Sequence, residues 1–123
     1  MSYAERHRVS VTTDASGDAT TYTPVITGRI AAIVYTKTDF ASGVDFTITS
    51  EATGQSIWAE SDVNASKTVA PMQPGHSQAG VALTYASGGT AVTQPIVVAS
   101  DRVKIVVGSG GDTKTGTFDV ILS

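Results

Sequence analysis

Two β-branched residue types dominate this chain and limit what it can fold into. Its 123 residues include eighteen Thr and fifteen Val but only two Leu. Branching at Cβ restricts χ1 and suits a pleated strand better than a helix. No window places apolar residues at i, i+3, i+4 and i+7, the spacing of an amphipathic helix. The composition therefore predicts an all-β protein.

Several segments have the period of a strand. Residues 44–50 and 117–122 alternate between apolar and polar side chains, as half-buried strands do. Residues 29–36 are apolar on both faces, which predicts a central strand. Turn residues inside 8–23 predict a hairpin, and the glycine-rich stretch 108–115 predicts a second hairpin tip.

The whole pattern gives eight to ten short strands separated by closely spaced turn signals. This is typical of an antiparallel β-sandwich or barrel of jelly-roll or Greek-key type. The chain length suits one domain over residues 1–123, and no linker divides it. Residues 61–80 have the weakest strand pattern and are predicted as an extended loop or arm. Residues 1–8 are predicted as an N-terminal arm.

Charge and composition exclude several classes of function. The net charge is −3, and the eight Lys and Arg are scattered, so nucleic acid is not expected as a partner. The absence of Cys excludes disulfides and thiolate metal sites. No apolar stretch reaches the 18 residues or so that a membrane helix needs. Because the N-terminal segment lacks an apolar signal region, we expect synthesis and folding in the cytoplasm.

No residue pattern predicts catalysis, and we expect neither an enzyme nor a cofactor. His7 and His76 lie far from further zinc ligands, of which three or four are needed. Residues 108–111 are glycine-rich but lack the spacing of a phosphate-binding loop. Glu51 and Glu60 could form a glycosidase pair, although surface solvation explains them more simply. No metal site is predicted.

Aromatic residues offer one alternative function. Trp58, Tyr22, Tyr35 and Tyr85 could form a platform on which sugar rings stack. The alternative hypothesis is therefore a carbohydrate- or receptor-binding β module. Only 7% of the residues are aromatic, so the core competes for these same side chains.

Two stretches of the sequence carry a family resemblance. One contains VTTDASGDATTY at residues 11–22 and continues through 27–30. The other contains LTYASGGTAV at 83–92 and continues through 101–118. Both resemble small virion proteins encoded in the structural modules of tailed phages and prophages. The resemblance implies a structural protein, most specifically a capsid decoration or cement subunit on the capsid surface, made in the host cytoplasm. Under the alternative hypothesis, the carbohydrate- or receptor-binding module would belong to a phage tail or fibre.

This resemblance also implies the partners. The major capsid protein is the expected partner, and a homo-oligomer is expected, with a trimer as one arrangement on a symmetry axis. Extended arms can add strands to a partner sheet, so the two predicted arms are the candidate contact regions. The candidate partner-binding residues are Tyr3, Arg6, Arg8, Val69, Pro71, Met72, Gln73 and His76.

Overall fold

The structure is a computed structural model that describes residues 4–84, 89–90 and 92–123. Ten strands and no helix occur in these residues. The strands are β1 (Glu5–Thr12), β2 (Ala19–Tyr22), β3 (Ile26–Lys37), β4 (Val44–Ser50), β5 (Ser56–Val63), β6 (Lys67–Val69), β7 (Met72–Pro74), β8 (Thr93–Asp101), β9 (Val103–Gly108) and β10 (Thr115–Leu122).

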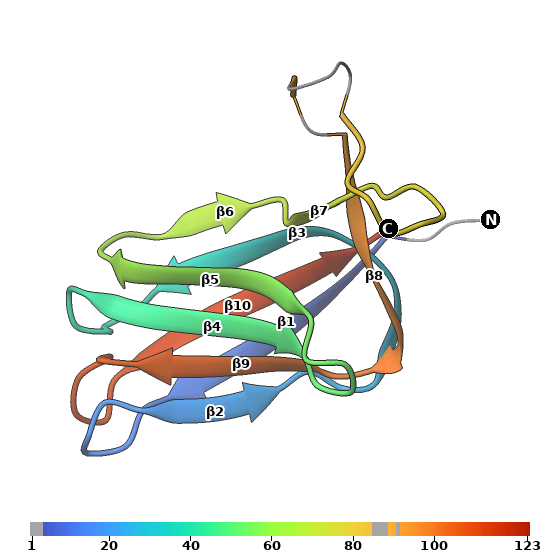
Figure 1. Cartoon of the computed structure of the whole chain (residues 1–123). Helices are drawn as coiled ribbons and strands as arrows, with labels where there is room; N and C mark the ends of the chain where they lie inside the picture. The colour runs from blue at the N-terminus through green and yellow to red at the C-terminus, as the bar shows by residue number, and fades with distance from the viewer. Residues whose placement is uncertain (1–3, 85–88, 91) are drawn as a thin grey trace.

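The strands form two antiparallel sheets that stack face to face (Figure 1). One sheet has the order β1-β10-β3-β8-β7, with β6 also paired to β3, and the other has the order β2-β9-β4-β5. Without β6 and β7, these orders are those of an eight-stranded jelly roll. The predicted all-β sandwich is thus confirmed, and the sheets stay open rather than closing into a barrel. The predicted central strand is β3.

Both predicted hairpins are wrong. β1 and β2 lie in different sheets, and so do β9 and β10. The turns at 13–18 and 109–114 therefore carry the chain from one sheet to the other. Turn residues mark a change of direction but do not specify which strands pair afterwards, so a crossing resembles a hairpin in the sequence. Of the consecutive core strands, only β4 and β5 pair directly.

The crossing turns are joined to one another at one end of the sandwich. Gly17 adopts a φ of 83° and its carbonyl accepts a hydrogen bond from Gly110 N–H at 2.9 Å. Ala41 N–H, in the β3–β4 connection, donates to Gly110 O at 2.9 Å. Thr13 Oγ1 donates to Gly111 O at 2.6 Å. This end of the molecule is consequently fixed by backbone hydrogen bonds between residues distant in the sequence.

Side chains from both sheets meet in one core. The predicted inward residues Val44, Phe46 and Ile48 are all buried. Five aromatic rings form the centre of this core, and neighbouring ring centroids lie 4.5–6.2 Å apart. The rings are those of Tyr35, Phe40, Phe46, Trp58 and Phe118.

Candidate partner-binding arm

The chain leaves the sandwich between β7 and β8. We call the described residues 71–84, 89–90 and 92–95 the arm, and Figure 1 shows that they project from the end of the six-stranded sheet. Three backbone hydrogen bonds of 2.8–3.0 Å form a ring at its base, joining Gly75, Leu83 and Val92. A bridge also pairs His76 with Ala82. The described part of the arm is therefore held by its own hydrogen bonds.

The arm carries no formal charge. Residues 68–100 contain no Asp, Glu, Lys or Arg, so all eight basic and all eleven acidic residues lie in 1–67 and 101–123. Charged side chains are depleted at the centres of protein interfaces, because burying an unpaired charge is costly. The arm can be buried against a partner without this cost.

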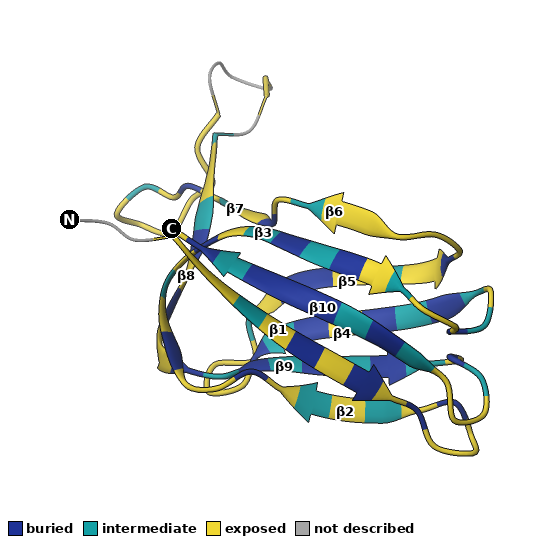
Figure 2. Cartoon of the chain, turned by 180° about the vertical axis from the view of Figure 1, so that it is seen from behind, coloured by how far each residue is buried: buried dark blue, intermediate teal, exposed yellow. Residues whose placement is uncertain are grey.

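Exposed apolar side chains accompany the missing charge. Met72 is 51% exposed, Val81 63%, Leu83 43% and Val97, on β8 beside the arm, 55%. These are four of the six large apolar residues exposed in the described ranges. Figure 2 shows the same concentration of exposed residues along the arm. A clustered exposed apolar surface is typical of an interaction site.

A shallow hollow of about 200 Å³ lies at the base of the arm. It is lined by Arg29, Gln94, Pro95 and Val97, on the outer side of β3 and β8. Met72 stands opposite Pro95 in the β7–β8 pairing, so its exposed side chain belongs to the same region. Arg29 is the one charged residue in this lining.

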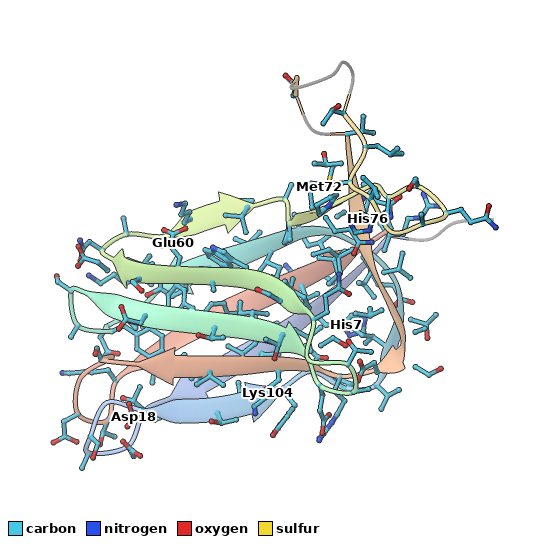
Figure 3. All side chains as sticks on the ribbon, viewed as in Figure 1. His7, Asp18, Glu60, Met72, His76 and Lys104 are labelled. Atoms are coloured by element: carbon cyan, nitrogen blue, oxygen red, sulfur yellow. The ribbon has the colours of Figure 1, made fainter. Side chains whose placement is uncertain are left out.

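The candidate residues of the predicted region 61–80 include both exposed and internal side chains. Figure 3 shows Met72 and His76 at the base of the arm, where both are exposed. Gln73 is half-buried, and its Oε1 accepts a hydrogen bond from Gln55 Nε2 at 2.5 Å. Pro71 is buried and Val69 packs against the core, so these two residues stabilise the sandwich itself.

The N-terminal residues lie on the opposite edge of the sheet. β1 and β7 are four strands apart, which is about 19 Å. Arg8 forms a bidentate ion pair with Asp119, in which Nε and Nη2 donate to the two carboxylate oxygens at 2.9 and 3.1 Å. This pair holds the pKa of Asp119 below its usual range. Arg6 is exposed beside it, and Tyr3 lies outside the described residues. The candidate residues thus form two separate groups.

The aromatic platform does not form in the described residues. Trp58 is only 8% exposed and packs its ring against Phe46, while Tyr35 is fully buried. Tyr22 remains partly exposed, with the Arg102 guanidinium 4.1 Å from its ring centroid. Tyr85 lies outside the described residues. Trp58 and Tyr35, which the platform would need on the surface, are buried in the core instead.

Glu51 and Glu60, which were considered as a glycosidase pair, bind different cationic side chains. Glu51 binds Arg102 through two bonds of 2.5 and 2.6 Å, whereas Glu60 accepts from Lys67 at 2.7 and 2.8 Å. These hydrogen bonds lower the pKa of both carboxyl groups. Each carboxylate therefore has a cationic partner of its own.

One polar cluster has no signal in the sequence. Asp101 is buried at the β8–β9 corner and accepts hydrogen bonds from the Ser50 hydroxyl and the Ala52 and Arg102 N–H groups. A hollow of about 310 Å³ adjoins it, lined also by Val25. Asp101 joins two strand connections that are fifty residues apart, which the local pattern could not reveal.

Two further observations concern the described part of the chain. It holds no cluster of three or more His, Cys, Asp or Glu side chains placed to bind a metal ion. None of its segments is a helix with the length and apolar character needed to cross a membrane.

The chain was compared with known proteins through family models and through curated sequences. Neither comparison gives a match.

Proposed function

We propose that this chain is a structural subunit of a tailed-phage virion, which decorates the capsid by docking its arm on neighbouring capsid subunits. The observation that carries this proposal is the arm: an uncharged projection with exposed Met72, Val81 and Leu83 on a compact sandwich. The resemblance described above supports a virion protein and the major capsid protein as partner. The jelly roll adds an argument by analogy only, because capsid and lectin domains both use it.

The physical character of the arm suits such a contact. Burying an apolar side chain stabilises a complex, and no charge on the arm loses its hydration. The sandwich is held at its far end by the joined crossing turns, so it can act as a rigid body behind the arm. Contacts of this kind weaken little with salt, because they contain no exposed ion pair to screen.

Binding to capsids made without this subunit tests the proposal. Val81→Ser should weaken binding about tenfold, because most of one Val side chain is worth about 1.5 kcal/mol when buried. Val25→Ser is the matched control, since Val25 is 66% exposed but lies beside Asp101, at the end of β8 away from the arm. Raising salt from about 0.1 to 0.5 M should change the affinity less than about twofold.

Two results would contradict the proposed role. Purified virions containing no copy of the chain would exclude a decoration subunit. Equal binding by V81S and V25S would show that the arm is not the contact surface.

A further inference from the structure

β1 is a long, regular and unpartnered edge of the six-stranded sheet. All eight of its residues pair with β10 without a register shift, and no other described strand pairs with its far side. The competing edges are less suitable: β2 has four residues, β6 and β7 have three, and the register of β5 shifts twice. An exposed edge of this kind is a template for another strand.

Hydrogen bonds at the strand ends show which backbone groups are free. Thr13 N–H donates to Lys114 O at 2.9 Å, so odd-numbered residues of β1 face β10. On the other side of β10, Ser123 exchanges hydrogen bonds with Arg29, which agrees with this alternation. The residues whose N–H and C=O point to the free edge are Arg6, Arg8, Ser10 and Thr12.

We propose that β1 pairs antiparallel with β1 of a second copy, about a two-fold axis at Val9. This register places Arg8 opposite Ser10 of the partner subunit and Arg6 opposite Thr12 of the partner subunit. All four outward-directed residues of each strand are then paired, with two hydrogen bonds for each pair. Two six-stranded sheets become one continuous sheet.

Charge selects this register over its neighbours. An axis at Arg8 places that residue opposite its own copy, and an axis at His7 places Arg6 opposite Arg8 of the partner subunit. Like charges directly opposite each other destabilise a sheet. An axis at Ser10 avoids this but leaves Arg6 unpaired. In the proposed register, Arg6 and Arg8 each stand directly opposite a neutral residue of the partner strand.

The pairing is independent of the proposed docking role, because β1 and the arm lie on opposite edges of the sheet. It gives a two-fold dimer, whereas the trimer named above was one possible arrangement of the expected homo-oligomer. If it occurs, light scattering should give twice the 12.6 kDa chain mass at roughly 100 μM protein. A chain that stays monomeric at that concentration would overturn the proposal.

Ser10→Pro tests the edge without touching the β1–β10 pairing. Proline removes the N–H of residue 10, which points outward, so the monomer keeps its hydrogen bonds while the dimer loses two. The dissociation constant of the dimer should rise at least about tenfold in S10P. Ser10→Ala keeps the N–H and should leave the dissociation constant unchanged. A dimer that survives in S10P, with circular dichroism unchanged, would contradict the edge pairing.

Engineered cysteines test the register. The chain contains no cysteine, so any disulfide reports only the new residue. Val9 faces itself across the proposed axis in a non-hydrogen-bonded pair, where Cα atoms lie about 4.5 Å apart and a disulfide can form. V9C should cross-link under mild oxidation, and S10C should not, because its copies stand diagonally. Cross-linking of S10C alone would place the axis elsewhere and refute this register.

Discussion

Tyr35 has an unusual position for a polar side chain. Its hydroxyl lies inside the aromatic core, and no described residue forms a hydrogen bond with it. Burial raises the pKa of Tyr35 to about 12, so the phenol stays neutral. We predict that Tyr35→Phe raises the free energy of unfolding by about 1 kcal/mol, because a buried hydroxyl without a partner is costly. Urea unfolding measures this, and a loss of stability would contradict it.

Asp101 is the buried carboxylate whose loss should matter most. The pKa of Asp101 lies below its ordinary 3.8, chiefly because it accepts a hydrogen bond from the Ser50 hydroxyl. Hydrogen bonds from the Arg102 and Ala52 N–H groups lower it further. A lowered pKa in the folded state stabilises the fold above the unfolded value, and this stabilisation disappears as the pH falls through the folded value. Asp101 thus contributes in full at neutral pH and progressively less below about pH 4.

Replacing this carboxylate gives a test with a pH signature. Asp101→Asn should lower the urea midpoint of unfolding at pH 7, because the Ser50 hydroxyl and the Ala52 and Arg102 N–H groups lose a charged acceptor. It should also reduce the loss of stability between about pH 4 and 2, because the titrating group is gone. Asp112→Asn, on an exposed turn, is the control and should leave the stability at pH 7 unchanged. Equal pH profiles for D101N and the parent would contradict the assignment.

For single residues, the sequence predicts which side chains are buried better than it predicts their hydrogen-bond partners. Alternation placed Val44, Phe46 and Ile48 inward correctly, because the period of a strand reports directly which face is buried. The aromatic residues were ambiguous, since a ring on a strand can face either the core or a ligand. The bonds of Asp101 were invisible, because Ser50 and Ala52 reach it only after the sheets have stacked.

Among the elements, the β3–β4 connection is fixed by one close contact. Phe40 lies over Gly116 of β10, where an added Cβ would stand 2.5 Å from the ring. We predict that Gly116→Ala costs about 1–3 kcal/mol of stability, because a buried ring and its neighbours must shift. Gly108→Ala is a matched control, since its nearest neighbour would be 3.8 Å away. Similar unfolding midpoints for the two variants would show that Phe40 moves freely.

Element positions were more predictable than element pairings. The central strand, for example, was visible as a local pattern. The crossing of β1–β2 and β9–β10 was not, because it depends on hydrogen bonds between turns, such as that of Gly17 with Gly110. A turn that is stabilised by another turn has no signature within its own residues.

For the whole molecule, the fold class follows from composition, but the arrangement of surfaces does not. Frequent Thr and Val predict sheets, and the number of strands predicts a sandwich. The two candidate contact regions were predicted separately, and only the sheet order places them on opposite edges. A dimer joined at β1 would therefore hold two arms facing away from each other, able to bridge two binding sites at once.

The pairing of β1 with β10 also has a consequence for synthesis. Glu5 of β1 pairs with Leu122 of β10, so β1 meets this neighbour only after all the strands between them in the sequence have been made. At about 5–20 residues per second, the nascent chain spends several seconds with this edge of β1 not yet paired to β10. The sheet can therefore close only after β10 has been made, whereas the hairpin β4–β5 can form earlier, as soon as its own two strands have emerged.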